Sequence, residues 1–110
     1  MFGGQVAEVL ANEVPEGGYL LDVREDDEWR AGRAPGATHI PLGTLGERAG
    51  EVPQDRKVYV ICRSGGRSGQ ATMALNQAGW DAVNVAGGMQ AWEHDGRDME
   101  ADSDTEPRVI

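Results

Sequence analysis

The sequence predicts a three-layer α/β domain with a mainly parallel central sheet, and two patterns carry that prediction. Short apolar runs typical of buried strands alternate along the chain with segments of helical periodicity, an order that covers both faces of a parallel sheet with helices. Asp22, Cys62 and the Ala86-Gly87 turn each follow an apolar run. Because such sheets bind ligands beyond the carboxyl ends of their strands, these positions predict a functional site at one edge of the sheet.

Strands and helices are expected to alternate from one end of the chain to the other. Four strands are expected where apolar residues run almost without interruption, at residues 19–23, 38–40, 58–61 and 82–85. Helices are expected at residues 5–12, 26–31, 44–49 and 68–78, and in a short final segment that holds Met89 and Trp92. The strand at 58–61 should be central, and Gly32 should end the helix at 26–31 as its C′ residue.

The composition indicates one soluble globular domain and restricts its partners. The chain has 110 residues, of which 39% are hydrophobic and 26% charged. No apolar stretch approaches the roughly 18 residues that a membrane span needs, and no secretory signal is visible at the N-terminus. The net charge of -9 disfavours nucleic acid and membranes as partners, whereas small anions and basic proteins stay open. A single free cysteine suits a reducing compartment, so we expect a cytoplasmic protein.

Acidic residues gather at the C-terminal end of the chain. Five of them lie in the last thirteen residues, a polar stretch with few apolar anchors: Asp98, Glu100, Asp102, Asp104 and Glu106. A segment of this composition buries too little apolar surface to order itself. The sequence therefore predicts a domain over residues 1–97 and an acidic, mobile tail over residues 98–110.

Cys62 is the one cysteine of the chain, and its neighbours predict a reactive thiolate. It ends the apolar run at 58–61 and opens the loop Arg63-Ser64-Gly65-Gly66-Arg67-Ser68, after which a helical pattern begins. Successive N–H groups in such a loop form a concave anion site, to which a helix N-terminus adds unpaired N–H groups. Cationic neighbours lower the pKa of a cysteine, so Cys62 is the candidate nucleophile. A buried structural cysteine is the alternative, but it would need neither the two glycines nor the two arginines.

The other loop residues have expected roles and plainer alternatives. Arg63 and Arg67 are expected to bind an anionic substrate, although Arg63 could be solvated and Arg67 could pair with surface acids. Ser64 and Ser68 are expected to donate hydrogen bonds to substrate oxygens or to cap the helix. The two glycines of the loop are expected to supply backbone conformations that other residues avoid.

No cofactor or metal site is expected. His39 and His94 are isolated from each other and from the cysteine in sequence, and two lone histidines do not make a ligand cluster. His39 is interpreted as a packed or hydrogen-bonded histidine. The three tryptophans are interpreted as packing residues of the core or its rim.

Four segments, in order along the chain, resemble the motifs of the rhodanese family of sulfurtransferases. They are residues 20–25 (LLDVRE), residues 28–41 (EWRAGRAPGATHIP), the loop at 58–68 (VYVICRSGGRS), and a closing segment at 78–80 and 85–92 (AGW and VAGGMQAW). The resemblance extends over about residues 5 to 96. The chain departs from the family's pattern at Arg33, where many relatives carry histidine, and in its acidic C-terminal tail.

The resemblance implies a rhodanese-like domain that transfers sulfur. Cys62 would attack the outer sulfur of a small anionic donor such as thiosulfate, and the resulting persulfide would pass its sulfur to a thiol, cyanide or protein acceptor. The N–H groups of the loop would hold the terminal sulfur. Asp22 corresponds to an acid that helps to hold the family's active-site loop, and its carboxylate could accept N–H bonds from that loop or pair with an arginine. Asp22 and Arg24 are expected to support the site from behind. Arg24 could also form an ion pair with Glu28.

Two other functions stay open at this point. Certain phosphatases also place a cysteine and an arginine around an anion loop, but with a longer spacing, whereas only four residues separate Cys62 from Arg67. The shorter loop encloses less space, which suits a sulfur atom better than a phosphate group. A relay or binding module that serves a dedicated protein partner would use the same residues as a free-standing enzyme.

Overall fold

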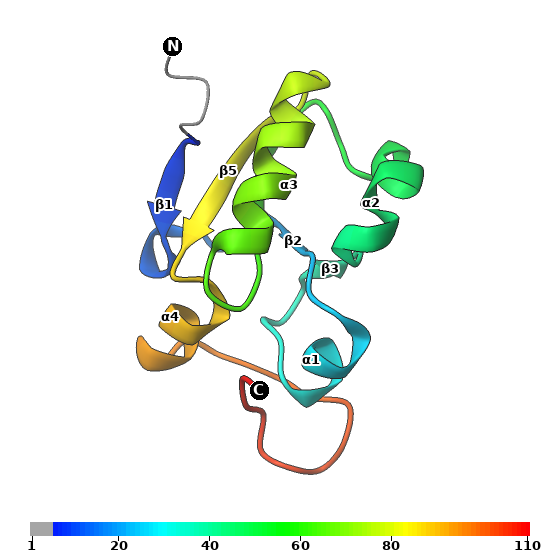
Figure 1. Ribbon diagram of the computed structural model, residues 1–110. Helices are drawn as coiled ribbons and strands as arrows, with labels where there is room; N and C mark the ends of the chain where they lie inside the picture. Colours follow the sequence, from blue (N-terminus) through cyan, green and yellow to red (C-terminus); the bar gives the residue numbers. More distant parts are fainter. Residues whose placement is uncertain (1–5) are drawn as a thin grey trace.

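Within residues 6–110, five parallel strands form the centre of the molecule, in the order β1-β5-β4-β2-β3; β1, β5, β2 and β3 of this sheet are labelled in Figure 1. The computed structural model describes residues 6–110. Its strands are β1 (Glu8–Leu10), β2 (Tyr19–Asp22), β3 (Thr38–His39), β4 (Lys57–Ile61) and β5 (Asp81–Ala86). Each of the strand pairs is parallel, so the carboxyl ends of all the strands lie at one edge of the sheet. The predicted parallel sheet and the central position of β4 are confirmed.

In the described part of the chain, four α-helices and two 3₁₀ turns connect or follow the strands. They are α1 (Asp26–Ala31), α2 (Leu42–Arg48), α3 (Gly66–Gln77) and α4 (Gly88–His94), with the turns η1 (Ala11–Glu13) and η2 (Ala49–Glu51). The helices predicted at 26–31, near 44–49, at 68–78 and around Met89 and Trp92 are confirmed, with small shifts of their ends. Within residues 6–110, no helix combines the length and the apolar character that crossing a bilayer requires.

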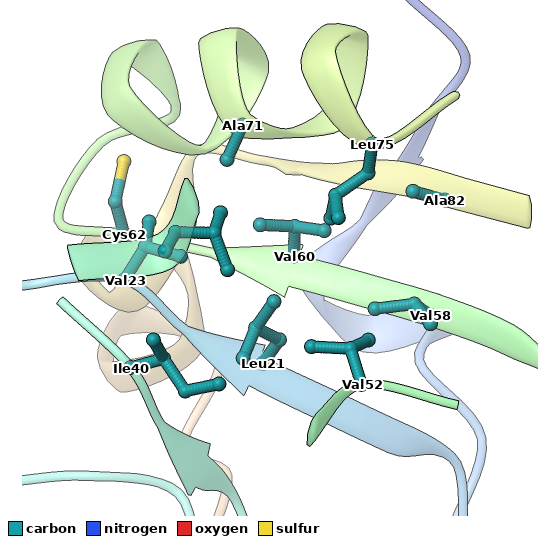
Figure 2. Close-up of a cluster of buried hydrophobic side chains, with 11 residues drawn as sticks. Leu21, Val23, Ile40, Val52, Val58, Val60, Cys62, Ala71, Leu75 and Ala82 are labelled. Atoms are coloured by element: carbon teal, nitrogen blue, oxygen red, sulfur yellow. The ribbon is translucent and has the colours of Figure 1, made fainter. Parts of the chain in front are cut away.

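The two faces of the sheet build two separate cores, because successive strand side chains point to opposite faces. On one face, strand residues pack against α2 and α3 (Figure 2); this core includes Leu21, Leu45, Val58, Val60 and Leu75. On the other face, strand residues pack against η1 and α4; this core includes Ala11, Leu20, Ile61, Val85, Met89 and Trp92. A sheet buried on both faces explains the uninterrupted apolar runs and gives the predicted three-layer α/β/α arrangement.

The helix predicted at residues 5–12 is wrong. Residue 5 lies outside the described residues, and the chain from Glu8 forms β1, an edge strand whose register places Glu8 beside Asn84 of β5. The Asn84 N–H also donates to the Ala7 carbonyl at 2.9 Å. A few apolar residues at helical spacing give a short helix little surface to bury, whereas the edge of β5 offers unpaired backbone groups. Pairing between distant segments therefore decides the structure here.

The C-terminal segment, which the sequence predicts to be a mobile tail, is paired with the domain in this structure. It runs beside α1 (orange to red in Figure 1). Glu100 and Arg33 exchange two backbone hydrogen bonds of 2.9 Å each. The Arg33 guanidinium also contacts the carboxylates of Glu100 and Asp102, at 3.5 and 2.6 Å. Glu100 and Asp102 therefore form ion pairs with Arg33, a residue far from them along the chain.

Gly32, which follows α1, also packs against the C-terminal segment. Its φ of 175° is extended, so it does not adopt the left-handed conformation expected of a C′ glycine. A Cβ at this position would lie 2.4 Å from the Arg108 carbonyl oxygen. The Arg108 N–H in turn donates to the Ala31 carbonyl at 3.0 Å. Glycine is required here because the C-terminal segment passes directly over it.

Candidate active site

The Cys62 thiol lies just beyond the end of β4, on the side of the sheet that α3 covers (Figure 2). The residue is 1% exposed and belongs to the core on that side. The Gly65 N–H donates to its Sγ at 3.1 Å, and the Ser68 hydroxyl donates to it at 3.2 Å. Cys62 is therefore buried, as the plainer alternative expected, and its sulfur is also surrounded by donors suited to a negative charge.

These donors determine the protonation of the thiol. Burial on its own raises the pKa of Cys62, because it removes the thiolate from water. The Ser68 hydroxyl and the N–H groups of Ser68, Gly65 and Ser64 outweigh this effect and lower the pKa of Cys62 below its ordinary value. Since the thiolate is the nucleophilic form of cysteine, the site favours the reactive species at a position shielded from bulk solvent.

The two loop glycines differ in what they contribute. Gly65 has a φ of 113° and forms the N-cap of α3, a left-handed conformation that residues with a Cβ rarely adopt. This conformation turns its N–H toward the sulfur. Gly66 is the first residue of α3, has no left-handed φ, and would have open space around a Cβ. The special backbone requirement predicted for both glycines therefore applies to Gly65 alone.

The first turn of α4 anchors the beginning of the loop. The Met89 N–H donates to the Cys62 carbonyl at 2.8 Å, and the Gln90 N–H donates to the Arg63 carbonyl at 3.0 Å. Gly88 makes this approach possible: its φ is 56°, and a Cβ there would lie 2.4 Å from the Cys62 carbonyl oxygen. The strand end of β4 and the turn after β5 thus meet at one edge, as the sequence predicts.

Arg67 is bound by Glu28 of α1, an acid that is largely buried and therefore not one of the surface acids considered as its partners. Its Nη1 and Nη2 donate to the two carboxylate oxygens at 2.7 and 2.9 Å, a bidentate pair that fixes the guanidinium plane. The Glu28 side chain is 12% exposed and that of Arg67 is 34% exposed. The Arg67 hydrogen bond is the main reason that the pKa of Glu28 is lowered, and the same bond raises the pKa of Arg67. Both groups therefore stay charged near neutral pH, and each offsets the other.

Arg63 lies on the exposed rim of the loop, where it meets the C-terminal segment. Its Nε donates to the Ile110 backbone oxygen at 3.0 Å. With the Gln90 amide oxygen turned toward the guanidinium, that oxygen accepts from Nη1 and Nη2 at 3.3 and 3.2 Å. Arg63 is thus engaged by two neighbours instead of being simply solvated.

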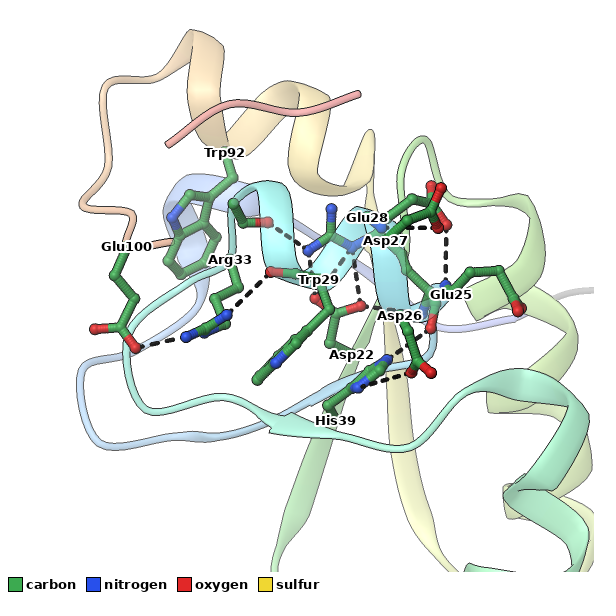
Figure 3. Close-up of polar contacts among 12 residues, drawn as sticks. Asp22, Glu25, Asp26, Asp27, Glu28, Trp29, Arg33, His39, Trp92 and Glu100 are labelled. Carbon is green, nitrogen blue, oxygen red and sulfur yellow. Dashed lines mark hydrogen bonds and ion pairs between the residues drawn. The ribbon is translucent and has the colours of Figure 1, made fainter. Parts of the chain in front are cut away.

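The ion pair considered between Arg24 and Glu28 is wrong. Arg24 pairs instead with Asp22, whose carboxylate accepts from Nε at 3.0 Å and from Nη2 at 2.8 Å (Figure 3). Both side chains are fully buried, and Nη2 also donates to the Gly32 carbonyl at 2.7 Å. Among the described residues, Asp22 takes its side-chain hydrogen bonds from Arg24 and none from the loop at 63–68. The pair supports the end of β2 and the turn after α1.

Asn84 of β5 belongs to the site, although it is not among the site residues predicted from the sequence. Its Oδ1 accepts from the Ser68 hydroxyl at 2.5 Å, and its Nδ2 donates to the Gly65 carbonyl at 3.1 Å. The residue is 2% exposed. One signal could have identified it: a lone polar residue inside the apolar run at 82–85 must find hydrogen-bond partners when the strand is buried.

His39 is held by Trp29 and by the backbone of Arg24. His39 stacks on Trp29 with ring centroids 4.6 Å apart, and its Nε2 lies 2.8 Å from the Arg24 carbonyl oxygen (Figure 3). The interpretation of His39 as a packed, hydrogen-bonded residue is confirmed. Within residues 6–110, no group of three or more His, Cys, Asp or Glu side chains is placed to hold a metal ion.

Comparison with known proteins identifies the family. A model of the rhodanese-like domain matches residues 6–95. The Bacillus subtilis protein named "Putative sulfurtransferase YtwF" is 44% identical over 81 residues, which are 74% of this chain and 79% of that protein. A sulfurtransferase of Allochromatium vinosum is 41% identical over 78 residues, which are 70% of this chain and 73% of that protein. The crystal structure of a rhodanese-related protein from Thermoplasma volcanium superposes with a TM-score of 0.83 at 32% identity, over 87% of this chain and 99% of that one. The chain belongs to the rhodanese-like domain family, whose members include these sulfurtransferases.

Proposed function

We propose that this protein is a sulfurtransferase that takes sulfane sulfur from a donor such as thiosulfate and carries it on Cys62 as a persulfide. The observation that supports this most is the pair of donors, from Gly65 and Ser68, aimed at a buried sulfur whose pKa is lowered. A cysteine that only filled the core would need no such donors. The sulfurtransferases among the relatives support the same class of reaction.

In the first step, the Cys62 thiolate attacks the outer sulfur of thiosulfate. A bond forms between Sγ and that sulfur, the bond to the sulfonate sulfur breaks, and its electron pair leaves with sulfite. The negative charge then sits on the terminal sulfur of the persulfide. The N–H groups of residues 63–67 would donate to this sulfur, in the same way that an oxyanion hole stabilises a developing charge.

In the second step, a thiophilic acceptor such as a thiol, cyanide or a protein attacks the terminal sulfur, and Cys62 leaves as a thiolate. A lowered pKa makes Cys62 a better leaving group, so the same hydrogen bonds serve both steps. Two successive displacements with a covalent intermediate predict ping-pong kinetics.

A persulfide relay to a dedicated protein partner is a second candidate. Two observations favour it: Cys62 is 1% exposed, and the charge of Arg67 is offset by Glu28. A small dianion such as thiosulfate gains less from a paired arginine than from a free one. A protein donor could compensate with contacts outside the loop.

Intact-mass spectrometry tests the proposal and separates the two candidates. The protein is incubated in turn with thiosulfate, with glutathione persulfide, and with a cysteine desulfurase plus cysteine. We expect Cys62 to gain the mass of one sulfur atom and to lose it when cyanide or a thiol is added, whereas Cys62→Ala gains none. Loading by the desulfurase but not by the small donors would favour the relay. Failure to load with every donor would refute the proposed function.

A further inference from the structure

The orientation of the Asn84 amide is fixed by its two N–H bonds. Nδ2 donates to Glu8 Oε2 at 2.9 Å and to the Gly65 carbonyl at 3.1 Å. Neither of these acceptors carries a hydrogen, so turning the amide over would bring its oxygen against two other oxygens. Oδ1 must therefore face the Ser68 hydroxyl, which lies 2.5 Å away.

The Ser68 hydroxyl has one proton and two acceptors. Its Oγ lies 3.2 Å from the Cys62 Sγ and 2.5 Å from the Asn84 Oδ1, and the residue is fully buried. While Cys62 is a thiol, S–H can donate to Oγ and O–H can donate to Oδ1, so every group is satisfied. Once Cys62 is a thiolate, the sulfur needs the Ser68 proton. The two oxygens are then left facing each other without a hydrogen between them, which is costly for buried groups.

We propose that Asn84 is a positioning residue for the chemistry at Cys62: by competing for the Ser68 proton, it sets how strongly that hydroxyl donates to the sulfur. The competition opposes the free thiolate. It does not oppose the persulfide, because there the negative charge has moved to the terminal sulfur and Ser68 can return its proton to Asn84. Asn84 therefore favours the sulfur-loaded form over the unloaded thiolate, a consequence that rests on the proposed function.

Other charged groups lie around the site, and one of them, Glu8, loses its bond to the Asn84 amide in the Asn84 variants. They come from four elements and are Arg67 on α3, Glu28 on α1, Glu8 on β1, and the Asp22–Arg24 pair around the end of β2. None of them is bonded to the Ser68 hydroxyl. A change in the thiol that disappears when Ser68 is removed therefore reports on the hydroxyl and not on these charges.

The test measures the pKa of Cys62 from the pH dependence of its alkylation by iodoacetamide. Ser68→Ala should raise this pKa by about one unit, because a hydrogen bond to a charged group is lost. Asn84→Ala should lower it by about half a unit, because the hydroxyl is then free to donate to the sulfur. The double variant should match Ser68→Ala. Asn76→Ala is the matched control. It removes a side-chain amide of α3 that bonds to the backbone of Ala82, on the same strand as Asn84, at 2.9 and 2.7 Å. It should leave the pKa of Cys62 unchanged.

Two results would overturn the inference. One is an unchanged or raised pKa of Cys62 in folded Asn84→Ala. The other is a double variant that differs from Ser68→Ala, which would mean that Asn84 acts through Gly65 or another route. If the Asn84 variants do not fold, NMR of the wild-type protein replaces them: the Asn84 side-chain amide signal should titrate together with Cys62, and a signal that ignores this titration would overturn the inference. Alkylation requires no sulfur donor, so its outcome is independent of whether Cys62 forms a persulfide.

Discussion

Replacing Glu28 by glutamine should increase the activity of the protein with thiosulfate. In the wild-type structure, both carboxylate oxygens of Glu28 accept from Arg67, at 2.7 and 2.9 Å. An anionic donor must compete with this carboxylate for the guanidinium. Glutamine is the suitable replacement because its oxygen can still accept from the Glu25 N–H, a bond of 3.0 Å at the start of α1, while the negative charge is removed.

The expected increase in activity follows from the strength of the hydrogen bond that Arg67 can make to the anionic donor once Glu28 no longer competes for it. A hydrogen bond between charged groups contributes about 1.5–3 kcal/mol. Arg67 is 34% exposed, so solvent screening places the expected gain at the lower end of this range. Because about 1.4 kcal/mol corresponds to a factor of ten, kcat/KM for thiosulfate should rise about tenfold at low ionic strength. The gain should shrink at about 0.15 M salt, where the Debye length is about 8 Å.

The assay follows thiocyanate formed from thiosulfate and cyanide. Glu51→Gln is a matched control, since Glu51 forms a comparable pair with Arg48, at 3.0 and 3.1 Å, on the surface formed by α2 and η2. It removes the same unit of charge and should leave the kinetics unchanged. A folded Glu28→Gln variant with unchanged or reduced kcat/KM would refute the reasoning, because Glu28 would then be orienting Arg67 for the donor instead of competing with it.

Three further predictions concern stability and metals. Arg24→Met should lower the free energy of unfolding by about 3–5 kcal/mol in urea titrations, because the carboxylate of Asp22 stays buried without its partner; a loss below about 1 kcal/mol would contradict this role of the pair. Gly32→Ala should speed proteolysis and amide exchange of residues 98–110, because a Cβ would collide with the Arg108 carbonyl, and unchanged protection would contradict this packing. EDTA should leave sulfur transfer unaffected, and activity lost to EDTA but restored by a divalent ion would reveal a metal requirement.

Elements with strong local signals could be predicted from the sequence. The apolar runs of β2, β4 and β5 indicate strands that are buried on both faces of a sheet, and the structure confirms this burial. The position of Cys62 at the end of β4 follows from the same pattern, as does the meeting of its loop with the turn before α4. These features depend on neighbours along the chain, which a sequence displays directly.

Features that depend on which of several possible partners a charge meets in space could not be predicted in this way. The competition for Arg24 is an example: Asp22 and Glu28 are both within reach in sequence, and only the turn after β2 brings the Asp22 carboxylate against the guanidinium. The C-terminal segment is another, because its acids find Arg33, which is remote along the chain. The composition of a segment predicts that its acidic residues are solvated. Whether the segment is ordered depends on whether these acids pair with cations elsewhere in the fold.

The pairing of charges around the loop implies that neutral donors control the thiolate. Asp22 neutralises Arg24 and Glu28 neutralises Arg67, while the donors to Cys62 are a hydroxyl and backbone N–H groups. Direct hydrogen bonds are not screened by salt, whereas the attraction of a free arginine is. The pKa of Cys62, measured by alkylation, should therefore change by less than about 0.2 units between about 0.01 and 0.5 M salt. In Glu28→Gln it should be lower at low salt and should rise as salt is added. A strong salt dependence in the wild-type protein would mean that Arg67 acts on the sulfur as a free charge despite its bond to Glu28.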